Sequence, residues 1–122
     1  MILADTGIWI DYFRGRNAKM RKLLEDGQIA MHPFVVAEIA LGSPHGRRKT
    51  LAEMGALWEV KVARLTEVRR MIESHALYSR GIGLVDAHLI ASCLITPGTE
   101  LWSRDVSLEK IARSLGVHAH LS

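Results

Sequence analysis

The chain has 122 residues, of which 48% are hydrophobic and 24% are charged, and its formal net charge is +3. This length and apolar content suit one compact domain and exclude an intrinsically disordered chain. No apolar run approaches the roughly 18 residues of a membrane-spanning helix, and the first residues lack the basic flank of a signal peptide. We therefore expect a single cytoplasmic domain over residues 1–122 that has no membrane partner. The lone cysteine, Cys93, excludes a disulfide framework and is expected in the core.

Short apolar segments alternate along the chain with segments whose apolar residues recur at helical spacing. Asn17, Thr66 and Ser107 are typical of helix N-caps. Strands separated by helices predict an α/β domain with a mainly parallel central sheet flanked by helices. In chain order, the pattern predicts a strand at 1–4, helices at 8–13 and 18–26, a strand at 28–31, helices at 33–42 and 47–56, a weak strand at 58–62, helices at 67–80 and 86–95, a strand at 100–102, a helix at 107–115 and a short strand at 116–118.

Four acidic residues differ from the others because they lie next to predicted strand ends or on apolar helices. Asp5 and Asp105 follow predicted strands, Glu38 lies within an apolar helix, and Asp86 lies in the first turn of another. Parallel sheets form their sites beyond the carboxyl ends of the strands. Acids gathered there and buried would repel one another unless a divalent metal neutralised them. Mg²⁺ and Mn²⁺ prefer such oxygen ligands and can activate water for attack on a phosphodiester.

Each of these acids also has an ordinary structural explanation. Asp5 and Asp86 are typical of helix N-termini, and Asp105 is typical of a turn that precedes a helix. Glu38 could pair with a nearby Arg or Lys. Only the joint placement of the four residues favours a metal site over these separate roles.

Basic residues gather in two places. Arg47, Arg48 and Lys49 are consecutive, and a second group of five lies within residues 14–22. Clustered cations can neutralise RNA phosphates, although an ordinary solvated helix face has the same composition. We interpret Arg47, Arg48 and Lys49 as candidate RNA-binding residues.

Four segments carry motifs in a specific order and spacing: Ile2–Gly15, Val35–Gly42, Gly83–Ala91 and Leu101–Asp105. Together they resemble the VapC-type toxins of the PIN-domain family, over essentially the whole chain. The resemblance implies a PIN fold and a Mg²⁺- or Mn²⁺-dependent endoribonuclease. The metal-site and catalytic acids that it implies, with two supporting hydroxyls, are Asp5, Glu38, Asp86 and Asp105, with Thr6 and Ser103.

The resemblance also implies partners. It predicts a homodimer that is neutralised by a cognate antitoxin, with DNA contacted only through that antitoxin. The RNA substrate would be a tRNA or a ribosomal RNA. The chain departs from the family pattern at Gly7, where the family often has Ser or Asn, and at Val106–Leu108, where an Asp-Phe pair often follows the fourth acid.

Two other functions fit parts of the pattern. A catalytically inactive PIN-like module would bind RNA or protein without turnover, but the retention of all four acids counts against it. A phosphoacceptor receiver domain is also α/β and acidic, but it needs paired acids after the first strand, where Asp5 stands alone.

Several other residues are of types that occur in reactive sites. Trp9 and Trp102 are expected to pack in the core rather than to stack on bases, and His88 is expected at the surface or just outside the site. His118 and His120 would supply only two ligands, which is too few for a metal site.

Overall fold

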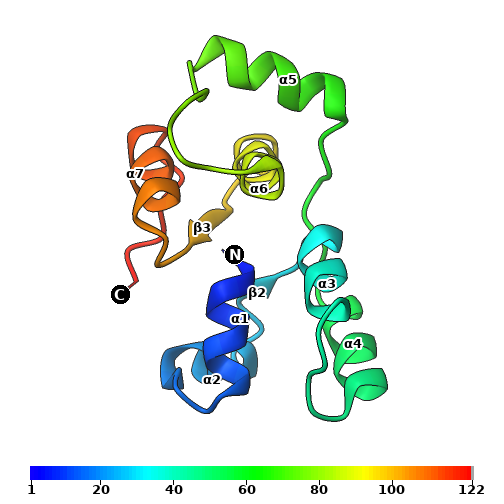
Figure 1. The fold of residues 1–122 in the computed structure, drawn as a ribbon. Coiled ribbons are helices and arrows are strands. Elements are labelled where there is room, and N and C mark those ends of the chain that lie inside the picture. The colour runs from blue at the N-terminus through cyan, green and yellow to red at the C-terminus, as the bar shows by residue number, and fades with distance from the viewer. Residues whose placement is uncertain (122) are drawn as a thin grey trace.

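The computed structural model describes residues 1–121, in which helices surround a small parallel sheet (Figure 1). The strands are β1 (Ile2–Ala4), β2 (Ile29–Ala30) and β3 (Glu100–Trp102). The helices are α1 (Thr6–Phe13), α2 (Ala18–Glu25), α3 (Pro33–Ala40), α4 (Arg47–Gly55), α5 (Leu65–Ser74), α6 (Leu84–Ile95) and α7 (Val106–Ser114). The prediction of an α/β fold with a mainly parallel sheet is therefore confirmed.

The sheet has the strand order β2-β1-β3, and both pairings are parallel. Leu3 of the central strand lies opposite Ala30 on one side and Leu101 on the other. Beyond the last residue of β1, the backbone N–H of Asp5 donates to the carbonyl of Trp102 at 3.0 Å. Because the strands are parallel, the residues that follow β1 and β3 emerge side by side at one edge of the sheet.

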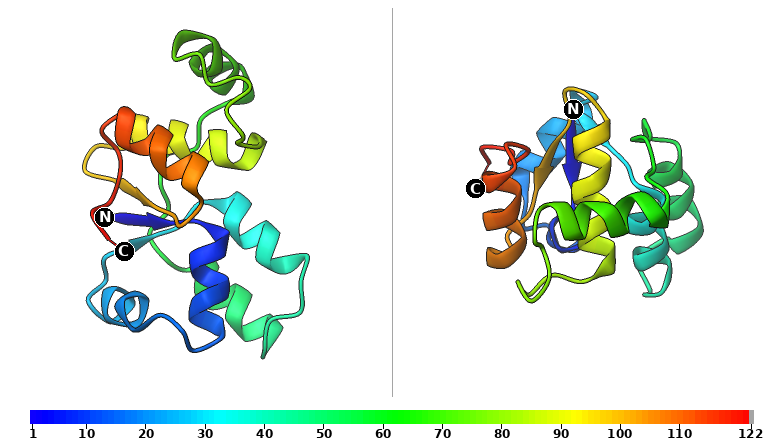
Figure 2. Two further views of the ribbon diagram at one scale, coloured as in Figure 1. Left: turned by 60° about the vertical axis from the view of Figure 1, so that its left-hand side comes forward. Right: turned by 90° about the horizontal axis from the view of Figure 1, so that it is seen from above.

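The strands lie between two groups of helices, α1 to α4 on one side and α5 to α7 on the other (Figures 1 and 2). Between these groups runs a continuous apolar core, in which Leu3, Ile8, Ile90, Leu101 and Leu108 are almost completely buried. Burial of the apolar faces of helices and strands is the main favourable contribution to folding. No helix within residues 1–121 combines the length and the apolar character needed to cross a bilayer.

Two predicted helix caps are wrong. Thr66 lies inside α5, which begins after Arg64, because the carboxylate of Glu67 accepts the backbone N–H of Arg64 at 2.9 Å and starts the helix earlier. Ser107 lies inside α7, whose N-cap is Asp105. At α7, the carboxylate of Asp105 takes the capping role that we assigned to a hydroxyl.

The helix predicted at 67–80 also ends earlier than expected, at Ser74. Ala76 has a φ of 50°, which is a left-handed conformation that an α-helix cannot contain. This turn directs Leu77 into the core, where it is 3% exposed. The free energy gained by burying Leu77 thus outweighs the free energy of continuing the helix.

The predicted strands at 58–62 and 116–118 are not formed as strands. Each contributes one isolated bridge to the edge of the sheet, between Met31 and Glu59 and between Leu101 and His118. Both segments run beside the sheet without a continuous ladder of hydrogen bonds.

Candidate active site

A pocket of about 370 Å³ opens at the edge of the sheet where β1 and β3 end. The structure brings all four predicted site acids to this pocket. Its lining residues are Asp5, Thr6, Gly7, Asp11, Glu38, Asp86, Leu89, Arg104 and Asp105. Residues from three helices, α1, α3 and α6, and from the loops after two strands therefore meet in one place.

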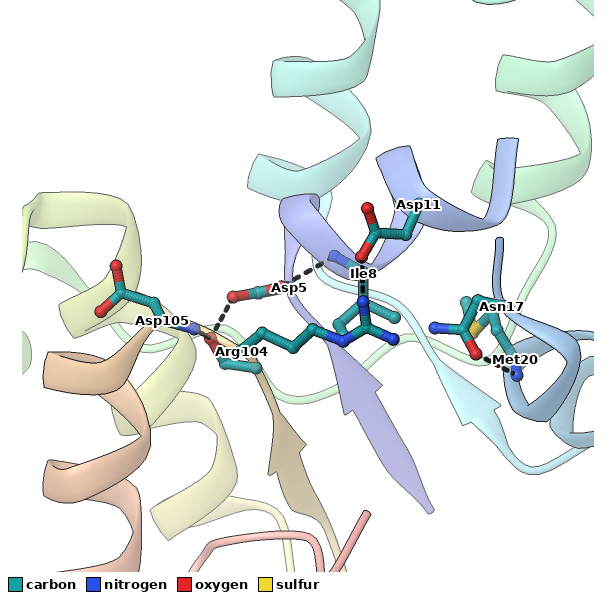
Figure 3. Close-up of polar contacts among 8 residues, drawn as sticks. Asp5, Ile8, Asp11, Asn17, Met20, Arg104 and Asp105 are labelled. Atoms are coloured by element: carbon teal, nitrogen blue, oxygen red, sulfur yellow. Dashed lines mark hydrogen bonds and ion pairs between the residues drawn. The ribbon is translucent and has the colours of Figure 1, made fainter. Parts of the chain in front are cut away.

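Asp5 is held by contacts on both of its carboxylate oxygens. Its Oδ1 accepts the backbone N–H of Ile8 at 3.1 Å and so caps α1 (Figure 3). Its Oδ2 accepts a hydrogen bond from the hydroxyl of Ser103. The oxygen of Ser103 in turn accepts the backbone N–H of Asp105 at 3.0 Å. Ser103 therefore connects the acid that follows β1 to the acid that follows β3.

Asp86 and Asp105 both lie at helix N-termini. Asp105 Oδ1 accepts the backbone N–H of Leu108 at 2.9 Å, and Asp86 Oδ2 accepts that of Gly83 at 3.3 Å. The partial positive charge of a helix N-terminus stabilises a carboxylate there. The capping roles that the sequence suggested for these acids are thus compatible with a place in the pocket.

Glu38 approaches the pocket from α3, where Val35 and Ile39 pack into the core. The Thr6 hydroxyl donates a hydrogen bond to Glu38 Oε1. Asp5 is buried, whereas Glu38 and Asp105 are exposed. They lie at the open side of the pocket.

The carboxylates affect one another electrostatically. Burial raises the pKa of Asp5 above its ordinary value, and the charges of Asp86 and Asp105 raise it further, although hydrogen bonds from Ser103 and Ile8 lower it. Burial also raises the pKa of Asp86, with added repulsion from Asp105 and Glu38. A bound cation would relieve this repulsion.

The donor set of the pocket fits a hard divalent cation that retains its water. Within residues 1–121, no three acidic, histidine or cysteine side chains are arranged so that they could hold an ion together. Magnesium is commonly bound through only one or two carboxylates while it keeps several water molecules. Glu38, Asp86 and Asp105 each use one carboxylate oxygen in a hydrogen bond with another described residue, which leaves the second oxygen for an ion or its water.

Comparison with known proteins identifies the family. The profile of the PIN domain matches residues 2–114. This chain belongs to the PIN-domain family. It is also similar to Ribonuclease VapC32 of two Mycobacterium tuberculosis strains, CDC 1551 / Oshkosh and ATCC 25618 / H37Rv, with 38% identity over 117 residues that cover 96% of this chain and 94% of the relative. The resemblance to VapC-type PIN domains that the motifs indicated is confirmed.

Sequence reasoning missed two residues at the pocket of this PIN domain. Asp11 lines the pocket, and its Oδ2 lies 2.7 Å from Nη1 of Arg104 (Figure 3). A signal for Asp11 was available, because it lies four residues after Gly7 and so on the same face of α1. Arg104 directly precedes Asp105, but nothing in the sequence shows where so long a side chain points.

The three predicted RNA-binding residues lie at the start of α4, outside the acidic pocket. Arg47 donates to the carbonyl of Ala40 at 2.7 Å and so stabilises the end of α3, and Lys49 lies 3.8 Å from Glu53. Arg48 makes no hydrogen bond or ion pair with another residue that the structure describes. Contact with RNA stays a prediction for all three, and Arg48 is the most available of them.

Two histidines next to the site are buried. Of our two expectations for His88, the position at the surface is wrong, because it is 4% exposed and packs against Phe34, with 4.6 Å between ring centroids. His32 is completely buried, and its burial, with the neighbouring His88, lowers its pKa to about 4. Both rings pack as neutral groups where the start of α3 meets α6.

Other residues of reactive type have structural roles. Trp9 and Trp102 are 3% and 1% exposed and pack in the core as predicted. Cys93 is buried, which raises its pKa to about 12 and leaves no reactive thiolate. His118 Nε2 lies 3.3 Å from a carboxylate oxygen of Glu109.

Proposed function

We propose that this PIN-domain chain is a divalent-metal-dependent endoribonuclease that hydrolyses RNA phosphodiester bonds. The observation that carries the proposal is the convergence of Asp5, Glu38, Asp86 and Asp105 on one pocket, with the pKa values of Asp5 and Asp86 raised by burial and mutual repulsion. Such a pocket is suited to bind a hard cation. The name of the relative VapC32, a ribonuclease, supports RNA as the substrate.

We expect one or two of these four acids to bind Mg²⁺ or Mn²⁺ directly, and the others to contact the water molecules that the ion retains. When bound, the ion would supply a Lewis acid for the phosphodiester and lower the pKa of the attacking water. Two hydroxyls orient the acids that receive it, Thr6 through its bond to Glu38 and Ser103 through its bond to Asp5. Each hydroxyl restricts the orientation of the carboxylate to which it donates, which favours ion binding.

We further propose that the chain is the toxin of a type II toxin–antitoxin pair, acting in the cytoplasm as a homodimer on tRNA or ribosomal RNA. The VapC-type match supports this role, and DNA would be contacted only through the antitoxin. A second pocket of about 390 Å³ shares Glu38 with the acidic pocket and is lined by Ile10, Phe13, Ile39 and Pro44 among others. An amphipathic antitoxin segment could lie there and direct an Arg or Lys toward the acids.

Three apolar residues, two on α1 and one at the end of α3, differ in exposure. Trp9 is buried, whereas Phe13 is 38% exposed and Leu41 is 89% exposed. Of the three, Phe13 and Leu41 therefore remain candidates for contact with a partner, with Phe13 among the residues that line the second pocket.

The deciding experiment is RNA cleavage by the purified protein with Mg²⁺, with Mn²⁺ and with EDTA, on tRNA and on ribosomal RNA. Our proposal predicts defined cuts that require the metal. RNA binding without cleavage under every metal condition would identify the chain as a catalytically inactive binding module.

A further inference from the structure

The acidic pocket contains one cation of its own. Among the described residues that line it, the acids are Asp5, Asp11, Glu38, Asp86 and Asp105, and Arg104 is the single basic side chain. An RNA phosphate that enters this pocket carries a negative charge. The four candidate ligands contribute a formal charge of −4, and a divalent cation contributes +2. The remaining net charge of −2 would still repel the phosphate.

The backbone of Arg104 is fixed on both sides. The preceding Ser103 donates to Asp5, and the following Asp105 donates its N–H to the Ser103 oxygen at 3.0 Å and caps α7. Neighbouring Trp102 accepts the N–H of Asp5. The backbone of Arg104 is therefore held in a constant position relative to the candidate ligands.

The side chain of Arg104, in contrast, is 52% exposed and extends over the pocket to Asp11 on α1 (Figure 3). A guanidinium group has five N–H donors, and the contact with Asp11 uses one of them. No other hydrogen bond of this side chain is made with residues 1–121. An exposed ion pair contributes little to stability, so a purely structural clamp is a weak explanation for this contact.

We infer that Arg104 binds the phosphate of the RNA substrate, and that Asp11 is a positioning residue that holds the guanidinium at the mouth of the pocket. The inference rests on the ribonuclease function proposed above. The planar guanidinium can bond to two phosphate oxygens at once, and its remaining donors allow this while Asp11 stays in contact.

Binding of fluorescently labelled bulk tRNA tests this inference without turnover. Every protein carries Asp5→Asn to prevent cleavage, and binding is measured across a range of salt concentrations with Mg²⁺ present. Added Arg104→Ala should weaken binding about tenfold, as expected for loss of a charge-assisted hydrogen bond, and should flatten the salt slope by about 0.7. Added Arg104→Lys should keep the slope and recover part of the affinity.

Asp11→Asn distinguishes two roles of Arg104. In one, Arg104 binds the phosphate; in the other, a structural clamp, its ion pair with Asp11 only holds α1 to the loop after β3. Our inference predicts that this variant keeps the salt slope and binds tRNA at least as tightly as its parent, because the amide oxygen of asparagine can still accept the hydrogen bond of Arg104 while a negative charge next to the phosphate is gone. A clamp predicts equal losses for Asp11→Asn and Arg104→Ala, since each breaks the same ion pair. The matched control is Arg69→Ala, which removes an arginine paired with Glu73 at 3.1 Å on α5, away from the pocket.

Two outcomes overturn the inference, and they can be told apart. If Arg104→Ala binds as tightly and with the same salt slope as its parent, or loses no more than Asp11→Asn, the role of Arg104 is wrong and the proposed ribonuclease remains. If the parent protein does not bind tRNA and the wild type cleaves no RNA, the proposed function and the role of Arg104 fall together.

Discussion

Ser103 donates a hydrogen bond to Asp5 across a separation of 98 residues in the chain. The same hydroxyl oxygen accepts the backbone N–H of Asp105 at 3.0 Å. One small side chain thus sets the relative position of two candidate metal ligands, and it lowers the pKa of the more buried one.

Ser103→Ala should raise the pKa of Asp5 further, because the hydrogen bond that favours its ionised form is lost. Since only the ionised form can bind a cation, metal binding and cleavage should then begin at higher pH than in the wild type. The measurement is the pH dependence of Mg²⁺ binding and of the cleavage rate. Ser114→Ala, which removes a hydroxyl at the end of α7, is the control. If Ser103→Ala leaves the pH at which metal binding and cleavage begin unchanged, the role of Ser103 is contradicted.

Asp5→Asn should abolish cleavage and leave the fold intact, because asparagine caps a helix about as well as aspartate does. A raised carboxyl pKa favours the folded state below the ordinary value of 3.8, and this contribution is lost as pH rises through the raised pKa. Without metal at neutral pH, the variant should therefore unfold at a higher temperature than the wild type. Asp26→Asn at the surface is the control, and near-normal cleavage by Asp5→Asn would refute the site assignment.

Mg²⁺ or Mn²⁺ should raise the unfolding temperature of the wild type at neutral pH, because binding to the folded state stabilises it. The effect should diminish as pH falls through the raised pKa values of Asp5 and Asp86, since protons then compete with the ion. Thermal unfolding with and without metal, at several pH values, measures this. Full cleavage after exhaustive chelation would rule out the metal mechanism.

Arg48→Ala should weaken RNA binding and flatten its salt dependence by about 0.7 in the logarithmic slope, which is the expectation for one lost contact with single-stranded RNA. Arg47→Ala should chiefly destabilise the protein, because Arg47 bonds to the end of α3. Salt titrations of RNA binding and thermal unfolding separate the two effects. With Lys110→Ala on α7 as a control, an unchanged slope for Arg48→Ala would identify the cluster as ordinary solvated surface.

The protein encoded beside this gene should bind the chain and inhibit it through a carboxyl-terminal segment that carries an Arg or Lys. Truncation of that segment should abolish inhibition, and Phe13→Ala should weaken the complex through lost apolar contact in the groove next to Glu38. Co-purification and inhibition assays measure both effects. A truncated partner that inhibits as well as the intact one would show that no inserted cation is involved.

Much of the fold follows from local rules that the sequence displays. Asn17 caps α2 as predicted, with its side chain accepting the N–H of Met20 at 3.0 Å. Asp5 and Asp105 could be placed together because each follows a strand, and parallel strands end at one edge of their sheet. The apolar residues that follow Asp86 predicted a helix, and so placed Asp86 in its first turn.

The remaining features depend on tertiary packing, which no local pattern reports. His88 is buried because α6 packs against α3, where Phe34 covers its ring. The early end of α5 depends on a place for Leu77 in the core. The pairing of Asp11 with Arg104 requires both the distance between α1 and the loop that follows β3 and the extended conformation of a long side chain.

The pairing of β1 with β3 also controls when the pocket can exist during protein synthesis. The central strand is made before its partner at Glu100–Trp102, and Ser103 follows Asp5 by 98 residues. A ribosome that translates this message therefore carries an incomplete pocket while these intervening residues are made. Premature termination anywhere before residue 100 would release a fragment without the third strand and without the acid that follows it.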